Sequence, residues 1–255
     1  MLEVVGIGKT FGALDVLADV SFGLGEREAL ALIGPNGAGK STCFNIVGGQ
    51  LRPSTGTVTF QGREIAGVPA HHASRREIGR TFQTAATFGS MSVRENVQMA
   101  LVAQEGRHRA LLPRMEGLYR DEAMAILTRV GLEENADSLC GTLAYGDVKR
   151  VEFAIAFARR PRLLLMDEPP AGMAVKERFA LMDLVLRIVR EERLAILFTE
   201  HDMDVVFNYA DRIMVLNRGR AVFSGAPAEV RSNDEVKRIY LGENDDGHLP
   251  GGAHG

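Results

Sequence analysis

The chain has no tryptophan and only two cysteines, Cys43 and Cys140, among its 255 residues. Two cysteines cannot form a disulfide framework, so we expect a protein of a reducing compartment. Aromatic residues make up only 6% of the chain, whereas hydrophobic residues in total make up 45%. With this hydrophobic content a chain of 255 residues can bury a large core, and we expect one main core with a smaller satellite.

An excess of positive charge is also missing, since the formal net charge is −3 and the isoelectric point is near 6.1. This disfavours nucleic acid or anionic lipid as a partner. Residues 104–119 contain several basic side chains, but their scarce aromatics favour a loop or broken helix over a nucleic-acid patch. The sequence shows neither a signal peptide nor a long apolar run, so we expect that the chain does not cross a membrane by itself.

Short apolar runs alternate with helical patterns along most of the chain, which is typical of an α/β fold. Residues 29–33, 163–166 and 195–199 are almost wholly apolar, as strands buried on both faces require. Such strands, alternating with helices, indicate a parallel sheet covered on both faces. We expect further strands at residues 2–7, 16–22, 57–60 and 213–216, and helices at residues 42–47, 123–130, 148–158, 176–191 and 205–209.

Local signals also mark a turn, a helix start and a tail. The Pro-Ser-Thr-Gly sequence at residues 53–56 predicts a turn before the strand at 57–60. Ser232 with Glu235 three residues later predicts a capping box that opens a short helix ending near Leu241. Residues 243–255, rich in Gly, Asp and His, are expected to be disordered.

A phosphate-binding loop is the strongest local pattern, and Gly-x-x-x-x-Gly-Lys-Ser runs from Gly34 to Ser41. Its glycines let successive N–H groups converge on phosphate oxygens, and the dipole of the following helix adds positive potential. Lys40 would reach the β- and γ-phosphates of a nucleotide, and the Ser41 hydroxyl would hold Mg²⁺. An apolar strand before the loop and an unbroken helical pattern after it disfavour a mere glycine-rich turn. The residues expected to bind nucleotide here are Gly34, Pro35, Asn36, Gly37, Ala38, Gly39, Lys40, Ser41 and Thr42.

Two carboxylates follow a second apolar strand directly. Asp167 and Glu168 come after residues 163–166 and before Pro169, at the strand end where open α/β sheets bind ligands. Four apolar residues followed by two acids form a Walker B element. Asp167 would organise the Mg²⁺ shell, and Glu168 would align or deprotonate the attacking water.

Together with these motifs, two further polar residues make the sequence resemble the ATP-binding cassette (ABC) family. Gln83 lies between the phosphate loop and the Walker B element, and His201 follows the apolar run at 195–199. The resemblance implies that Gln83 contacts Mg²⁺ or water and senses a membrane partner. It implies that His201 contacts the γ-phosphate and positions the catalytic carboxylate. It also implies that Phe11 stacks on adenine, with Val16 beside it.

Residues 143–147, Leu-Ala-Tyr-Gly-Asp, match the family signature, which is usually Leu-Ser-Gly-Gly-Gln. In the family this helix N-terminus faces the nucleotide held by the other subunit. Ala144 lacks the serine hydroxyl that would bond the γ-phosphate, and Asp147 places a carboxylate near it. The backbone donors remain and Gly146 still allows a close approach, so the resemblance implies binding in trans. The trans site would comprise Ala144, Tyr145, Gly146 and Asp147.

Within the family, the chain looks most like the ATPases of branched-chain amino acid importers. The likeness spans residues 2–243, and relatives in urea uptake and lipopolysaccharide export share several of its motifs. One departure is Ala174, where the family usually has Asp or Asn between the two nucleotide sites, and pairing with a non-identical ATPase would compensate. The motifs are Arg-Thr-Phe-Gln at 80–83, Glu-Asn-Val at 95–97, Pro-Pro-Ala-Gly-Met at 169–173, Glu-His-Asp-Met at 200–203 and Val-Lys-Arg-Ile-Tyr-Leu-Gly-Glu at 236–243.

The resemblance implies a P-loop NTPase (RecA-like) parallel-sheet core with an N-terminal antiparallel β subdomain and an inserted α-helical subdomain. Residues 1–242 would form a single ABC ATPase domain. Within it, residues 1–87 and 161–242 would form the nucleotide-binding core, and residues 88–160 the helical subdomain.

The resemblance also implies an ATPase that uses ATP and Mg²⁺ to power a multi-subunit transporter, most closely an importer of branched-chain amino acids or related small polar solutes. The chain would form a homodimer, or a heterodimer with a paralogous ABC ATPase, on transmembrane permease subunits at the cytoplasmic face of the cell membrane. A substrate-binding protein would be an indirect partner. The alternatives are urea-type import, lipopolysaccharide export, a non-transport cassette protein, and a regulatory subunit that barely hydrolyses ATP.

Overall fold

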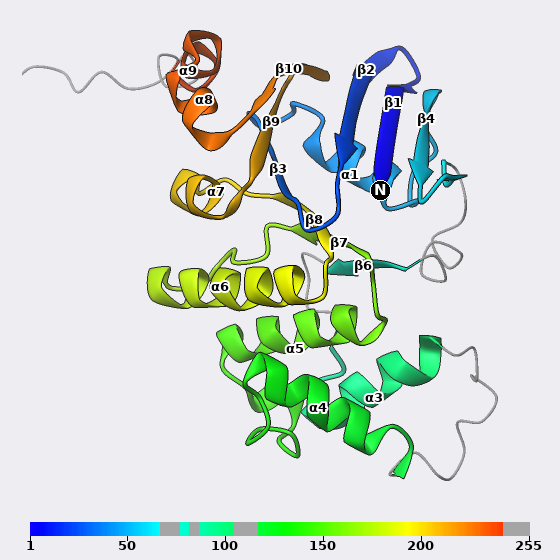
Figure 1. Ribbon diagram of the computed structural model, residues 1–255, viewed down its shortest axis with the longest axis vertical. Coiled ribbons are helices and arrows are strands. Elements are labelled where there is room, and N and C mark those ends of the chain that lie inside the picture. The colour runs from blue at the N-terminus through cyan, green and yellow to red at the C-terminus, as the bar shows by residue number, and fades with distance from the viewer. Residues whose placement is uncertain (67–76, 82–86, 105–116, 242–255) are drawn as a thin grey trace, which may run out of the picture.

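Two β-sheets organise the computed structural model, which describes residues 1–66, 77–81, 87–104 and 117–241 (Figure 1). The larger sheet runs through the centre of the molecule, and the smaller one lies beside it near the N-terminus. Gln83 and the expected tail at residues 243–255 lie outside the described residues.

The larger sheet contains six strands in the order β10-β9-β3-β8-β7-β6. The five strands from β9 to β6 run parallel, and β10 pairs antiparallel with β9 at one edge. Every residue of β3 and β8 is buried, which confirms the buried strands predicted there. The strands are β3 (Ala29–Ile33), β6 (Ile78–Thr81), β7 (Leu163–Asp167), β8 (Ala195–Thr199), β9 (Arg212–Asn217) and β10 (Arg220–Gly225).

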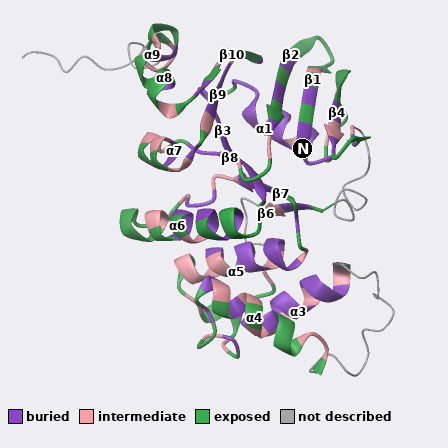
Figure 2. Ribbon diagram, viewed as in Figure 1, coloured by how far each residue is buried: buried purple, intermediate pink, exposed green. Residues whose placement is uncertain are grey.

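Both faces of this sheet are covered, as the apolar strands predicted. Ala29, Ala31 and Ile33 of β3 pack into one hydrophobic cluster, whereas Leu30 and Leu32 pack into another. Figure 2 shows the buried residues gathered along the central strands and on the inner sides of the helices. The first cluster takes side chains from α3 (Val93–Gln104), α4 (Arg120–Val130), α5 (Tyr145–Ala158), α6 (Val175–Glu191) and α7 (Met203–Tyr209), and the second from α1 (Lys40–Val47) and the smaller sheet.

The smaller sheet is antiparallel, in the order β2-β1-β4-β5. This confirms the antiparallel sheet expected near the N-terminus. The strand expected at residue 57 begins two residues earlier, so the predicted turn at 53–56 is too long. The strands are β1 (Leu2–Phe11), β2 (Leu14–Leu24), β4 (Thr55–Phe60) and β5 (Arg63–Glu64).

The helical segment contains α3, α4, the short 3₁₀ helix η4 (Cys140–Thr142) and α5, and α3 packs against both α4 and α5. The helices predicted at residues 123–130 and 148–158 are confirmed, each with an earlier start. The boundaries proposed for a separate helical subdomain, at residues 88 and 160, stay a prediction.

The C-terminal capping box is wrong. Ser232 ends α8 (Pro227–Ser232), and its hydroxyl donates to the carbonyl of Glu229. Asn233 lies between the two helices, and its Oδ1 accepts the N–H groups of Glu235 at 2.9 Å and Val236 at 3.0 Å. The side chain that caps α9 (Asp234–Leu241) is therefore one residue later than predicted.

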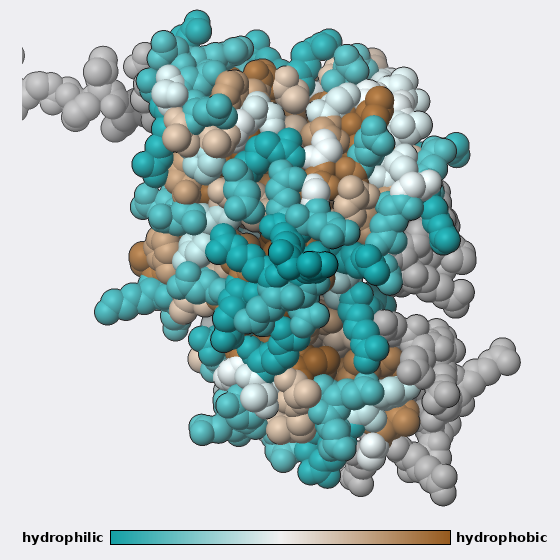
Figure 3. Space-filling model, viewed as in Figure 1, coloured by the Kyte–Doolittle hydropathy of each residue, from teal (hydrophilic) through white to brown (hydrophobic). Residues whose placement is uncertain are grey.

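One face of the molecule is seen in the space-filling view (Figure 3) and is mainly polar. On the face seen in Figure 3, hydrophilic side chains gather across the middle, and hydrophobic ones are scattered between them. Within residues 1–66, 77–81, 87–104 and 117–241, no helix combines the length and the apolar character that a bilayer span needs.

Candidate functional site

The phosphate loop joins β3 to α1, and its backbone depends on glycine at two positions. Gly34 has φ 150°, and a Cβ there would lie 2.1 Å from the carbonyl oxygen of Leu216. Gly39 has φ 101° and stands at the start of α1. A Cβ on Gly39 would lie 2.9 Å from the carbonyl oxygen of Val16. A side chain at either position would displace the backbone of a neighbouring strand, so the loop geometry requires both glycines.

Lys40, the first residue of α1, is folded back onto the loop. Lys40 is only 8% exposed, and its Nζ donates to the carbonyl oxygens of Gly34 at 2.6 Å and Pro35 at 2.9 Å. The ammonium is thereby held at the loop, where a positive charge would meet phosphate oxygens.

A cavity of about 240 Å³ opens beside the phosphate loop and brings most of the predicted site residues together. The loop supplies one wall, β2 supplies Val16, and the ends of β7 and β8 supply two further polar side chains. The lining residues are Val16, Asn36, Gly37, Ala38, Gly39, Lys40, Ser41, Thr42, Glu168 and His201.

Glu168 and His201 form a close pair in this cavity. His201 Nε2 lies 2.7 Å from Glu168 Oε1, within hydrogen-bond distance. Glu168 has φ 47°, and its N–H donates to Thr199, to the carbonyl oxygen at 3.1 Å and to Oγ1 at 3.2 Å. The left-handed backbone turns the Glu168 carboxylate out of the strand, and the adjacent strand end fixes that turn.

Asp167 is held from both neighbouring strands. Thr199 pairs with it across β8, and the Thr199 hydroxyl donates to Asp167 Oδ1 at 2.5 Å. On the other side, Arg80 of β6 places Nη2 3.9 Å from Asp167 Oδ2. Burial lowers the pKa of the Arg80 guanidinium, and the Asp167 charge opposes that shift. No sequence signal assigned a role to Thr199 or Arg80, because both contacts depend on the strand order β6-β7-β8.

The loop carrying His201 is shaped by the carboxylates on either side of it. Glu200 is buried, and its Oε1 accepts the N–H groups of His201 and Asp202, both at 3.1 Å. Burial raises the pKa of Glu200 despite these two donors. Asp202 caps α7 and forms an ion pair with Arg178 of α6. The position of His201 is thus set by hydrogen bonds to its own loop and by an ion pair to α6.

The predicted signature begins α5. Ala144 is the residue before the helix, with an extended backbone, and its carbonyl accepts the N–H groups of Asp147 at 3.0 Å and Val148 at 3.1 Å. Tyr145 is 48% exposed, and its hydroxyl donates to the carbonyl oxygen of Ala171 at 3.1 Å. None of the signature residues lines the cavity beside the phosphate loop. Their role in trans stays a prediction.

Four further predicted site residues are described but do not line the cavity: Phe11, Gly34, Pro35 and Asp167. Phe11 is 50% exposed at the end of β1, and Lys9 Nζ lies 5.0 Å from the centroid of its ring. It is absent from the cavity lining, whereas Val16 is present. Gln83 lies outside the described residues. The adenine contact of Phe11 and the metal contact of Gln83 stay predictions.

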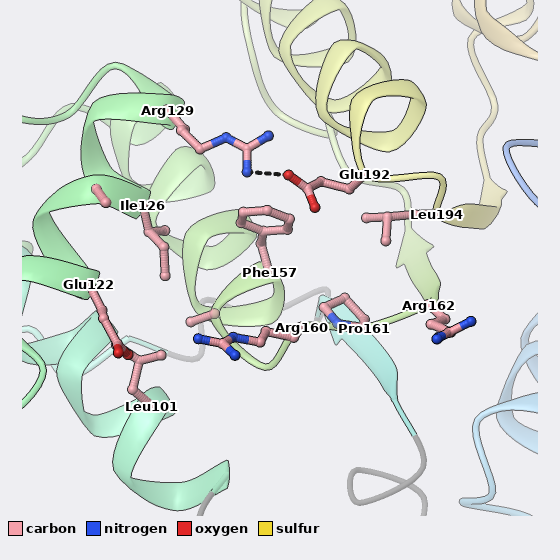
Figure 4. A pocket seen from close by; sticks show the side chains of 12 residues that line it. Leu101, Glu122, Ile126, Arg129, Phe157, Arg160, Pro161, Arg162, Glu192 and Leu194 are labelled. Atoms are coloured by element: carbon pink, nitrogen blue, oxygen red, sulfur yellow. Dashed lines mark hydrogen bonds and ion pairs between the residues drawn. The ribbon is translucent and has the colours of Figure 1, made fainter.

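A second, larger pocket of about 400 Å³ lies between α4, α5 and the end of α6 (Figure 4). Ile126, Phe157 and Leu194 give it apolar walls, and an ion pair between Arg129 and Glu192 crosses it above the Phe157 ring. Its lining includes no residue predicted to bind nucleotide. We therefore take the smaller cavity beside the phosphate loop as the candidate site.

Family models match most of the chain. The model described as ABC transporter matches residues 17–171, and the model described as branched-chain amino acid ATP-binding cassette transporter matches residues 222–246. The chain is 40% identical to the high-affinity branched-chain amino acid transport ATP-binding protein LivG of Salmonella typhimurium, over 95% of this chain and 98% of that protein. It is 38% identical to the corresponding protein BraF of Pseudomonas aeruginosa, with the same coverage.

Solved structures show the same fold. The ADP conformation of MJ1267, an ATP-binding cassette of an ABC transporter, superposes with a TM-score of 0.86 at 30% identity, covering 95% of this chain and 98% of that one. A nucleotide-free ATP-binding cassette from an ABC transporter gives 0.83 at 28% identity, covering 94% of this chain and 98% of that one. These likenesses and the sheet order give this chain the fold of an ABC ATPase cassette, with a P-loop core and an antiparallel N-terminal sheet. With its phosphate loop, its Glu168–His201 pair and these relatives, the chain belongs to the ABC transporter family, as an ATPase that powers transport.

Proposed function

We propose that this ATPase powers the import of branched-chain amino acids through a membrane complex. Relatives at 37–40% identity over 95% of the chain are named as branched-chain amino acid transport ATP-binding proteins, which supports this substrate class. The observation that carries the hydrolytic part is the Glu168–His201 pair, 2.7 Å apart, in the cavity that the phosphate loop lines.

The residues present fit a nucleotide with Mg²⁺. The cavity offers backbone N–H groups, the buried Lys40 ammonium and the Ser41 hydroxyl to a nucleotide and its metal. Asp167 ends β7 directly before Glu168, and its carboxylate, like the Ser41 hydroxyl, is an oxygen ligand of the kind that Mg²⁺ prefers. Asp167 would be kept in place by Thr199 and Arg80. We include Gln83 as a third metal contact on family grounds. Mg²⁺ would neutralise charge on the phosphate oxygens.

Glu168 and His201 divide the remaining work at the γ-phosphate. The Glu168 carboxylate aligns the attacking water and accepts its proton, because Glu168 is the acidic residue in the cavity lining. His201 holds Glu168 in that orientation through the 2.7 Å contact, and offers its ring to the γ-phosphate. Lys40 stabilises the negative charge that develops during transfer.

A second cassette completes each site. The start of α5 carries backbone N–H groups and the positive end of a helix dipole, and in a head-to-tail pair it faces the nucleotide of the partner. The signature residues Ala144, Tyr145, Gly146 and Asp147 would bind there in trans. The pair is a homodimer or a heterodimer with a paralogous ABC ATPase.

Permease subunits would hold the pair at the cytoplasmic face of the membrane, and a substrate-binding protein would deliver the solute to them. Phe88 is a candidate contact for a permease, since it is 56% exposed next to α3. Its N–H and carbonyl are both bonded by the Asn96 side chain, at 2.8 and 3.1 Å, so the exposed ring sits on a fixed backbone.

The rival solute class comes from one relative in particular. The chain is 30% identical to the lipopolysaccharide export system ATP-binding protein LptB of Haemophilus influenzae, over 95% of this chain. The higher identity of the LivG and BraF proteins favours amino acid import over this alternative.

Transport by the assembled complex tests the proposal. The full chain is purified with the membrane proteins that accompany it and placed in proteoliposomes. Transport of labelled leucine, isoleucine and valine across the membrane is then measured with ATP on the side that the ATPase faces. We expect uptake and ATP turnover by the wild type. Glu168→Gln should lower both about 100-fold or more, the range that a lost general base costs. Glu133→Gln, at an exposed carboxylate on the helical segment, should change neither.

Equal ATP turnover by wild type and Glu168→Gln would remove Glu168 from its role. ATP turnover without amino acid uptake would contradict the substrate class, and negligible turnover by the wild-type complex would favour a regulatory subunit.

A further inference from the structure

Tyr145 joins the start of α5 to the segment that follows the catalytic carboxylate. Its hydroxyl donates to the carbonyl oxygen of Ala171 at 3.1 Å, within the same chain. The ring is in contact with that segment too, because a Cβ on Gly172 would lie 3.4 Å from Tyr145 Cε1. The signature residue at this position therefore has its polar atom engaged in cis.

The segment that Tyr145 contacts, residues 171–173, is hydrogen-bonded directly to Glu168. The Ala171 N–H donates to the Glu168 carbonyl at 3.0 Å, which closes a tight turn over Pro169 and Pro170. Gly172 follows with φ 78°, a left-handed conformation. A displacement of Ala171 would thus be passed to the backbone of Glu168 through one turn.

Arg178 holds the same segment from the other side. It forms an ion pair with Asp202, the residue after His201, and its Nη2 donates to the carbonyl oxygen of Met173 at 3.4 Å. Hydrogen bonds and an ion pair therefore connect residues 171–173 to both members of the catalytic pair. The turn connects them to Glu168, and Arg178 with Asp202 connects them to His201.

We propose that Tyr145 is a positioning residue for hydrolysis, whose hydroxyl couples the signature end of α5 to the Glu168–His201 pair of its own chain. The inference rests on the proposed function, in which the same end of α5 faces the partner's nucleotide. Movement of α5 on binding that nucleotide is then transmitted to Glu168 through Tyr145 and Ala171. Two sites that share a helix in this way hydrolyse ATP cooperatively.

The hydrogen bond from Tyr145 to Ala171 matters because Ala174, directly after this segment, lacks a polar side chain. Ala174 precedes α6 with an extended backbone, and its methyl group offers no polar contact at the place where the family usually has Asp or Asn. Tyr145 supplies a polar link between the signature and the same segment, three residues earlier.

The test compares two variants that each lose one tyrosine hydroxyl. Tyr145→Phe keeps the ring on Gly172 and removes the bond to Ala171. Tyr209→Phe is the matched control, since the Tyr209 hydroxyl donates to the Phe179 carbonyl at 3.0 Å and to Asp183 at 2.8 Å, between α7 and α6. ATP turnover is measured against ATP concentration on the complex of the full chain with its permease subunits. Binding of ADP to the isolated chain is measured by calorimetry.

We expect Tyr145→Phe to lower kcat about two- to tenfold, the effect of one neutral hydrogen bond expressed at the transition state, and to lower the Hill coefficient for ATP. ADP affinity should stay at the wild-type value, and Tyr209→Phe should keep wild-type kcat and Hill coefficient. An unchanged kcat in Tyr145→Phe, or a parallel loss of ADP affinity that marks general damage to the fold, overturns the inference.

A double-substitution cycle tests the path to His201. Arg178→Gln combined with Tyr145→Phe should lower kcat by less than the product of the two single effects, because both residues hold residues 171–173. Effects that multiply would overturn the shared path.

A separate arm keeps the proposed function distinguishable. ATP-dependent pairing of chains is measured by gel filtration with Glu168→Gln as the parent, alone and with Tyr145→Phe. Failure of the parent to pair overturns the proposed head-to-tail function, and this inference with it. If Glu168→Gln pairs both with and without Tyr145→Phe, and Tyr145→Phe by itself leaves kcat unchanged, the inference about Tyr145 is overturned and the proposed function is not.

Discussion

Glu200 shows how a single buried carboxylate supports the loop carrying His201. One oxygen accepts two backbone N–H groups around His201, whereas Oε2 is buried and has no hydrogen-bond partner among the described residues. Burial raises the pKa of Glu200, and the two N–H donors and the Arg178 charge lower it by less. The charged form therefore shapes the loop at a cost in stability.

This cost predicts a pH dependence. Because the pKa of Glu200 is higher in the folded than in the unfolded chain, the folded chain binds more protons between the two values, and stability falls as pH rises through that interval. Glu200→Gln removes the titration and keeps an oxygen for the N–H groups. We expect the Tm of Glu200→Gln, relative to wild type, to increase from about pH 4 to about pH 7. Thermal unfolding of both proteins across that range measures it, with Glu133→Gln as an exposed control.

A Tm difference between Glu200→Gln and wild type that is flat, or that decreases as pH rises, would contradict the prediction. It would show that the hydrogen bonds to His201 and Asp202 outweigh the burial of the charge.

At the scale of elements, the sequence predicted best those strands and helices whose pattern is self-contained. The bounds of β3 and β8 agree with the prediction because every residue of both strands except Thr199 is apolar. β6 and β10 were missed. β6 has only four residues, with Gly79 and Arg80 in its middle, and β10 is an edge strand in which only Gly225 is buried. Pairing with β7 and β9, rather than residue type, makes these segments strands.

An experiment can show which of two neighbouring residues, Ser232 or Asn233, caps α9. Asn233 caps α9 through two N–H groups, whereas the Ser232 hydroxyl donates to a carbonyl at the end of α8. Asn233→Ala should lower the free energy of unfolding by about 1 kcal/mol, and Ser232→Ala by clearly less. Urea denaturation of the two variants measures both values. A larger loss for Ser232→Ala would restore the capping box that the sequence predicted.

At the scale of the whole molecule, the parts of the site were predictable and their support was not. The phosphate loop, Asp167 and Glu168 are each local patterns, so the sequence was sufficient to locate them. Thr199 and Arg80 act because β7 lies between β8 and β6, and that order becomes visible only in the folded chain. Other contacts between distant segments were equally unpredictable from the sequence, including the hydrogen bond from Tyr145 of α5 to Ala171.

The attachment of the helical segment to the sheet can be divided into apolar and ionic contributions. Buried side chains of α3, α4 and α5 share one hydrophobic cluster with β7 and β8. At the edge of that cluster, Arg129 of α4 forms ion pairs with Glu191 at 3.1 Å and Glu192 at 2.6 Å, and lies over the Phe157 ring (Figure 4). All three charged side chains are at least one-third exposed, so water screens the pairs.

If the apolar cluster dominates, Arg129→Met should lower the free energy of unfolding by only about 1 kcal/mol at low salt, and by less as salt screens the lost pairs. Arg129→Lys should retain part of the difference, and Arg190→Met, an exposed arginine of α6, serves as the control for charge removal. Urea denaturation at low and high salt measures all three. A loss above about 3 kcal/mol that salt does not reduce is the magnitude of a broken buried pair. It would mean that Arg129, rather than the cluster beneath it, holds the helical segment on the sheet.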